Sequence, residues 1–91
     1  MVAIPTIHLN GTDGEVLLRD YLDMHRCIEV AIDQMQSKSP NGRDYYVQGT
    51  EAFKQASVEH GNRVLKLREV ADELMEIAEA IAEQNTRRIL S

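Results

Sequence analysis

The chain has 91 residues, of which 27% are charged and 4% aromatic, and its formal net charge is −5 at pH 7. This length gives one small domain with an aliphatic core, and the composition favours helices over a β-sandwich. The acidic balance excludes a protein that coats nucleic acid or an anionic membrane, because such proteins need a surplus of Lys and Arg.

Residues 1–11 are predicted to form an extended arm, because apolar and polar residues alternate through most of this stretch. A helix is predicted over 12–37, begun by a capping box in which Thr12 accepts from a backbone amide and Glu15 reaches back. Pro40 ends this helix, since proline disfavours the helical conformation of the residue before it. The apolar stripe of the helix comprises Leu18, Tyr21, His25, Ile28, Ile32 and Met35.

Residues 38–49 are predicted to form a loop, and residues 50–86 a second, longer helix. Its stripe repeats at steps of three and four for four heptads: Phe53, Ser57, His60, Val64, Leu67, Ala71, Leu74, Ala78 and Ile81. Residues 1–91 are therefore predicted to be a single all-α domain. Its architecture is an antiparallel, coiled-coil-like helical hairpin with an extended N-terminal arm.

The unequal lengths of the two helices predict self-association. If residue 36 lies near residue 50, the second helix beyond about residue 73 has no partner within the hairpin. The stripe nevertheless continues there, and each large apolar side chain left in water would forgo about 1.5–3 kcal/mol. Either the arm or a second copy must cover this end. We expect a helix-bundle homo-oligomer, a dimer or higher, with the arm packed into it.

Two histidines of the stripes are candidate metal ligands. In this register His25 lies opposite residue 61, beside His60, with Glu29 and Cys27 nearby. Two imidazoles with a carboxylate or thiolate suit zinc. The alternative is a polar layer that fixes the helix register, as polar core positions do in coiled coils. We favour the polar layer, because no local ligand spacing such as HExxH or CxxC is present.

The block "TIHLNGT" is a candidate anion site. Free amides at the start of a helix attract anions, and Asn10 with the glycine after it lets the backbone approach a ligand closely. His8 can add a hydrogen bond, and Thr12 lies at the helix start. The alternative is a simple helix cap that follows an extended arm.

The loop "PNGRDYYVQG" contains two of the three tyrosines next to an arginine. Tyr45 and Tyr46 point in different directions, so we expect one to pack over Met35 and Phe53 and the other to be exposed. Arg43 with an exposed tyrosine is typical of protein-binding hot spots, and equally of sites that stack on a base or clamp a phosphate. The alternative is that both rings only fasten the loop to the hairpin.

Nothing in the sequence indicates catalysis or a cofactor. Cys27 lies in a helix without a basic neighbour other than Arg26, and no Ser-His-Asp order or cofactor fingerprint is present. A lone cysteine forms no internal disulfide, and the start, Met1–Pro5, lacks the features of a secretory signal. No apolar run approaches the roughly 20 residues that span a bilayer. We therefore expect a cytoplasmic protein that is not an enzyme, has no cofactor and does not engage a membrane.

At "IPTIHLNGT" and "PNGRDYY" the chain resembles short helical proteins encoded by bacteriophages and prophages. The resemblance implies the cytoplasm of a host cell as the setting. It further implies a binding role, either on a host defence or regulatory protein or on a nucleotide-like signal.

Three functions follow as expectations. The first is an oligomeric binding protein that inhibits a host protein by occupying its surface through Arg43 and Tyr46. The second is a sponge that captures a nucleotide-derived signal between subunits, with His8 and Asn10 on the phosphate and Arg43 with a tyrosine on the base. The third is a structural component of a virion or of its assembly.

Overall fold

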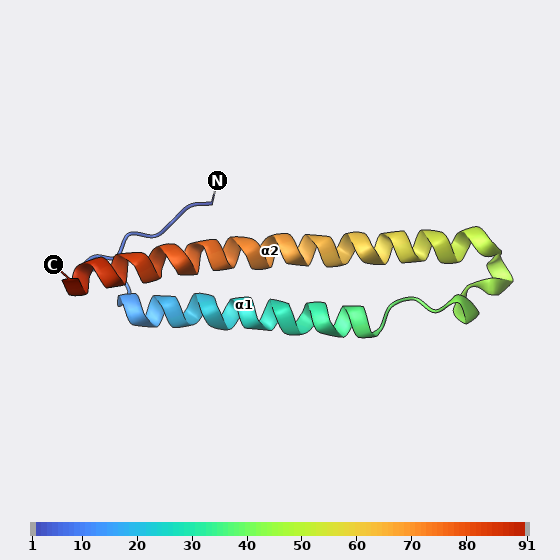
Figure 1. Cartoon of the computed structure of the whole chain (residues 1–91), viewed down its shortest axis with the longest axis horizontal. Helices are drawn as coiled ribbons and strands as arrows, with labels where there is room; N and C mark the ends of the chain where they lie inside the picture. The colour runs from blue at the N-terminus through green and yellow to red at the C-terminus, as the bar shows by residue number, and fades with distance from the viewer. Residues whose placement is uncertain (1, 91) are drawn as a thin grey trace.

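The computed structural model describes residues 2–90, so both ends of the predicted domain, Met1 and Ser91, lie outside the described residues. The elements in chain order are α1 (Gly14–Ser37), the 3-10 turns η1 (Gly42–Asp44) and η2 (Tyr46–Gln48), and α2 (Thr50–Leu90). The two helices run antiparallel and side by side in a rod of 65 × 22 × 20 Å (Figure 1). This confirms the predicted all-α helical hairpin, and residues 2–90 contain no strand.

The start of α1 is fixed by a cap and by a close contact with α2. Asp13 Oδ2 accepts hydrogen bonds from the two amides that follow Gly14, at 3.1 and 3.3 Å. The predicted cap at Thr12 is therefore wrong by one position. Gly14 is buried against Asn85, which donates to the Gly14 carbonyl oxygen at 3.1 Å. A Cβ at Gly14 would collide with the Asn85 side chain, so this contact requires the glycine.

The predicted stripe of α1 and the part of the α2 stripe from His60 onward form the interface between the helices. Steps of three and four keep these residues on one face of each helix, because a turn takes 3.6 residues. The buried residues at the centre are Ile32, Val64 and Ala71, with Ile28, Met35 and Leu67 packed against them. Within residues 2–90, neither helix contains an apolar stretch that could cross a bilayer.

The predicted register of the hairpin is wrong. His60 Nε2 lies 2.6 Å from the Met35 carbonyl oxygen, and Asn85 bonds to Gly14, so α1 faces residues 60–85 of α2. The cause lies in the loop, which does not turn back at once after α1. It runs on beside the first turns of α2 before it reaches Thr50 (Figure 1). α2 therefore projects past α1 mainly at the loop end, with residues 50–59, and less at the end where the chain termini lie, with residues 86–90 (Figure 1).

The N-terminal arm lies along the C-terminal part of α2 (Figure 1). Gln84 holds it at two points: Nε2 donates to the Pro5 carbonyl oxygen and Oε1 accepts from the Ile7 amide, both at 2.9 Å. Arg88 donates to the Ile7 carbonyl oxygen at 2.9 Å, on a part of α2 beyond its predicted end at residue 86. Three apolar residues of α2 near this end are buried within one chain, Ile77, Ala78 and Ile81, whereas Ile89 and Leu90 are exposed. A second copy is therefore not needed to bury these three residues, and the predicted homo-oligomer stays a prediction.

Candidate functional site

The loop between the helices, residues 38–49, has a defined conformation. Asn41 Oδ1 accepts from the Arg43 amide at 3.0 Å and thereby starts η1. Backbone hydrogen bonds of 2.9–3.2 Å close both 3-10 turns. Gly49 joins η2 to α2 with φ of 105°, a conformation that residues with a side chain rarely adopt. The residues between Asn41 and Gly49 are therefore presented in one arrangement. We call residues 43–48 the tip loop.

The two tyrosines of the tip loop have different environments. Tyr45 is half-buried and its ring lies against Phe53, with ring centroids 6.4 Å apart and the planes tilted by 43°. Tyr46 is 73% exposed and Val47 is 78% exposed. Arg43 is also exposed. The predicted division between one packed and one exposed tyrosine is confirmed, and Tyr45 is the packed one. Val47 was not predicted as a site residue. The clue in the sequence is that an apolar residue directly follows the two tyrosines at a loop position.

The position of Met35 differs from the prediction. Met35 packs against the cluster at the centre of the hairpin and is contacted by His60, so it does not lie under the tip loop. Phe53 alone of the two predicted residues supports the Tyr45 ring. The shifted register explains the difference, because the end of α1 lies beside residue 60 and not beside residue 50.

A hollow of about 340 Å³ lies where the arm, the start of α1 and the end of α2 meet; we call it the terminal hollow. Two predicted site residues, His8 and Thr12, line it, whereas Asn10 does not. The His8 ring lies over Gly11, where a Cβ would be 3.0 Å from His8 Nε2. The polar residues that line the hollow, besides these two, are Asp13, Glu15, Asn85 and Arg88.

The electrostatics of the terminal hollow are mixed. The amides of Glu15 and Val16 at the start of α1 already donate to the Asp13 carboxylate. Asp13 and Glu15 also place two acidic groups at the end of the helix where an anion would bind. Arg88 adds a positive charge, and its guanidinium donates to the Ile7 carbonyl oxygen. A phosphate at this position would therefore compete with a carboxylate of the chain itself.

A groove of about 390 Å³ lies on one side of the rod, at the level where α1 ends. It is mainly apolar, and sequence reasoning missed it. The clue to an apolar surface here is that two large apolar residues, Val58 and Leu65, lie outside the predicted stripe of α2, with Gly61 between them. The residues that line the groove are Gln36, Ser39, Pro40, Ser57, His60, Gly61, Val64, Leu65 and Arg68. We call it the lateral groove.

The structure does not bring the two candidate metal ligands together. His60 bonds to the Met35 carbonyl oxygen, and Met35 lies ten residues beyond His25 on α1, a rise of about 15 Å. His25 Nδ1 instead lies 3.4 Å from Glu29 Oε1 on its own helix. Among residues 2–90, no three His, Cys, Asp or Glu side chains are placed to hold a metal ion. The predicted pairing of His25 with His60 is wrong.

Comparison of the chain with protein-family models, with curated proteins and with solved structures finds no match. The functional argument therefore depends on the geometry of three places: the tip loop, the terminal hollow and the lateral groove. Of these, the tip loop combines an exposed aromatic ring, an exposed aliphatic side chain and an arginine on a fixed backbone.

Proposed function

We propose that the chain is a non-enzymatic helical binding protein that modulates a partner protein through its tip loop. In the phage setting that the resemblance implies, the partner is a host defence or regulatory protein. Binding inhibits it by occupying its surface. The observation on which this proposal depends is the exposure of Tyr46 beside Arg43, while Tyr45 supports the loop from beneath.

The composition of the tip loop supports a protein as the partner. Tyrosine and arginine are enriched among the residues that dominate binding energy at protein interfaces. A tyrosine ring gives a large contact area, and it has few rotatable bonds to immobilise on binding. Val47 extends the apolar surface next to Tyr46. Left in water, these side chains contribute nothing to the stability of the hairpin, and contact with a partner would bury them.

The fixed conformation of the loop supports the same proposal. The Asn41 cap, Gly49 and the Tyr45–Phe53 contact hold Tyr46 in place before any partner arrives. A preorganised loop loses less conformational entropy on binding than a mobile one does.

A second candidate function is the capture of a small nucleotide-like ligand. The specific observation that favours it is the terminal hollow, where Arg88, Asn85 and His8 could contact a polar ligand. Asp13 weighs against it, because its carboxylate uses the amides that a phosphate would need. The partner-protein proposal therefore ranks first.

The test is a photo-crosslinking residue placed at Tyr46 of the full chain in host cells, followed by affinity measurements on the protein that it captures. Tyr46→Ala is expected to reduce affinity by roughly 30-fold, which corresponds to about 2 kcal/mol, the value that defines a hot spot. Arg43→Ala is expected to reduce affinity at least tenfold. Both variants should melt within about 2 °C of the wild type, because both side chains are exposed.

Two controls make the result specific. Val30→Ala changes an exposed apolar residue on α1, away from the tip loop, and should leave the affinity unchanged. Tyr45→Ala should lower the melting temperature, because it removes the ring that packs on Phe53. If Tyr46→Ala binds the captured protein as tightly as the wild type, the tip loop is not the binding site and the proposal fails.

A further inference from the structure

α2 carries a second row of residues at steps of three and four, on a flank that α1 covers only in part. Val58 and Leu65 in this row are 63% and 58% exposed, although both are large and apolar. Gly61, Leu65 and Arg68 of the row line the lateral groove. The full row, which we call the second seam, is Val58, Gly61, Leu65, Arg68, Asp72, Met75, Glu79 and Ala82.

The second seam is only partly covered within the hairpin: Met75 and Ala82 are half-buried and Arg68 borders α1, whereas the other residues of the seam are exposed. The arm bonds to Gln84 and Arg88, which lie on a different flank of α2. Gly61 costs the helix about 1 kcal/mol relative to alanine. The hairpin offers no reason for this glycine, because no atom lies within 4 Å of the place where a Cβ would be. A glycine facing outward does allow the backbone of another helix to approach closely.

The second seam is complementary to itself when one copy is reversed. Residues at equal distances before and after Val70 pair by type: Leu65 with Met75, and Arg68 with Asp72. Further out, Val58 pairs with Ala82, and Gly61 leaves room for Glu79. At the centre of this arrangement, apolar residues thus lie opposite apolar ones, and the guanidinium of Arg68 lies opposite the carboxylate of Asp72. Two antiparallel helices packed along such a seam bring these residues face to face.

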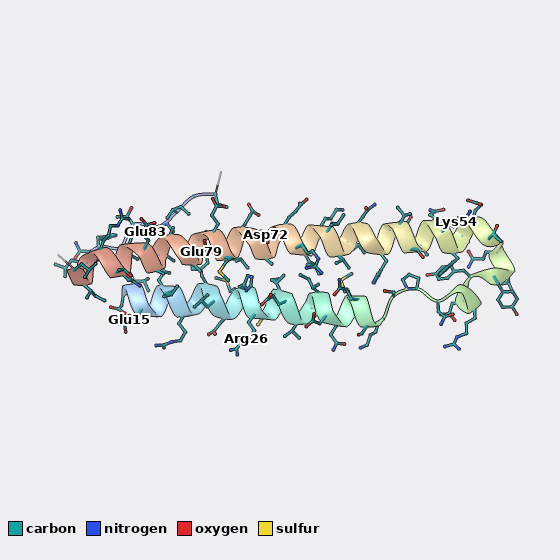
Figure 2. The ribbon with its side chains drawn as sticks, in the orientation of Figure 1. Glu15, Arg26, Lys54, Asp72, Glu79 and Glu83 are labelled. Carbon is teal, nitrogen blue, oxygen red and sulfur yellow. The ribbon has the colours of Figure 1, made fainter. Side chains whose placement is uncertain are left out.

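The charges of the whole rod select the same orientation. Residues 29–68, toward the tip loop, contain six Lys or Arg and five Asp or Glu, a net charge of +1. The remaining residues contain four Lys or Arg and ten Asp or Glu, a net charge of −6, so that the chain totals −5. Figure 2 shows Asp72, Glu79 and Glu83 spread along α2 in the acidic half, with Lys54 near the other end. A parallel pair would place acidic half beside acidic half, whereas an antiparallel pair avoids this repulsion.

Arg68, at the centre of the second seam, lines a hollow of about 190 Å³ with Glu29 and Asp33 of α1 but forms no ion pair with either. Among the ion pairs formed within residues 2–90, none involves Arg68 or Asp72. Both side chains are exposed. In a two-fold symmetric pair, each contact occurs twice, so Arg68 of both copies would meet Asp72 of the other.

We infer that two copies of the chain associate antiparallel through the second seam, with the two-fold axis at the level of residue 70, between Arg68 and Asp72. This inference concerns the interface between copies and is independent of the proposed partner. Thr50 and Leu90 each lie 20 residues from Val70, so the tip loop of one copy would lie level with the terminal hollow of the other. The dimer thus presents two tip loops, one at either end of a rod that is thicker than a single copy and about as long.

The first test is sedimentation velocity of the purified full chain at concentrations up to about 1 mM, a range that covers weak dimers. The wild type is expected to sediment as a dimer. Leu65→Glu is expected to weaken the dimer at least tenfold. Val30→Glu is the matched control, because Val30 is exposed to a similar extent, 55% against 58%, but lies on α1 outside the seam. A monomeric wild type would overturn the inference, and so would equal effects of Leu65→Glu and Val30→Glu.

A charge exchange tests the register without relying on an apolar substitution. Arg68→Asp places acid against acid at the centre of the seam and should weaken the dimer at least tenfold. Adding Asp72→Arg to the same chain restores opposite charges in every symmetric pair, so the double variant should recover most of the wild-type affinity. Far-UV circular dichroism should be unchanged in both, because both side chains are exposed. If the double variant dimerises no better than Arg68→Asp, the copies do not pair in this register.

Discussion

At the scale of single residues, His60 connects the end of α1 to α2. Its Nε2 atom lies 2.6 Å from the carbonyl oxygen of Met35, within the last turn of α1. Carbonyl groups in the last turn of a helix lack a complete set of hydrogen bonds within the helix. The N–H of the imidazole supplies one, which assigns the proton to Nε2. His60 is thus a polar link between the two helices at one end of α1, as Asn85 is at the other.

His60→Phe keeps the apolar contact area but removes the donor, so it is expected to lower the free energy of unfolding by about 1 kcal/mol, within the 0.5–1.5 kcal/mol typical of one hydrogen bond. His60→Gln keeps an N–H donor at a similar reach and should lose less. Urea unfolding followed by circular dichroism measures both. Equal stability of the wild type and His60→Phe would show that the bond contributes nothing.

The sequence predicted which kinds of residue lie at the tip loop, but not their exact roles. A pair of adjacent tyrosines is expected to split between a packed and an exposed ring. Which ring packs depends on how η1 and η2 turn, and the Tyr45–Phe53 contact that fixes this is a tertiary interaction. The residue that caps the start of α1 was not predictable either, because Thr12 and Asp13 are both good capping residues. The buried contact between Gly14 and Asn85 decides between them.

At the scale of the elements, the arm is bound to α2 chiefly through one side chain. Gln84 uses both its amide nitrogen and its oxygen on the backbone of Pro5 and Ile7. These bonds hold the arm along a helix whose nearby residues, Ile77 and Ala78, are buried.

Gln84→Ala is expected to release the arm and lower the free energy of unfolding by about 1–3 kcal/mol, since two hydrogen bonds of about 0.5–1.5 kcal/mol each are lost. The amide of Ile7 should then exchange its hydrogen faster, because it loses its acceptor. Hydrogen exchange by NMR measures this directly. Gln55→Ala is the control: Gln55 bonds only to Glu59 on an exposed part of α2, so Ile7 exchange should not change. Unchanged protection of Ile7 in Gln84→Ala would contradict the clamp.

Both helices were predictable because their apolar residues repeat with the period of a helix over many turns. The register between them was not, because it depends on the path of the loop. A short turn would have placed residue 36 near residue 50, whereas η1 and η2 carry the chain along α2 first. The error placed most of the part of α2 that lacks a helical partner at the wrong end of the rod. It also produced the false pairing of His25 with His60.

At the scale of the whole molecule, the chain is a rod with different ends. One end presents the tip loop, and the other holds the arm, the terminal hollow and most of the acidic residues (Figures 1 and 2). A hairpin of two helices buries only the facing side of each, which leaves most of the second seam open along α2. Antiparallel pairing of two rods covers this seam and leaves both tip loops exposed for a partner.

The most direct test of this arrangement is a distance between the same residue in two copies. Lys54→Cys, made together with Cys27→Ser, places one spin label 16 residues from Val70 in each copy. Pulsed electron paramagnetic resonance should then give one distance of about 50 Å, because the labels are separated by twice that span at 1.5 Å per residue. Dilution with unlabelled protein should remove the signal. A distance below about 20 Å, as expected for parallel helices at packing distance, or no interaction between labels, would contradict the antiparallel dimer.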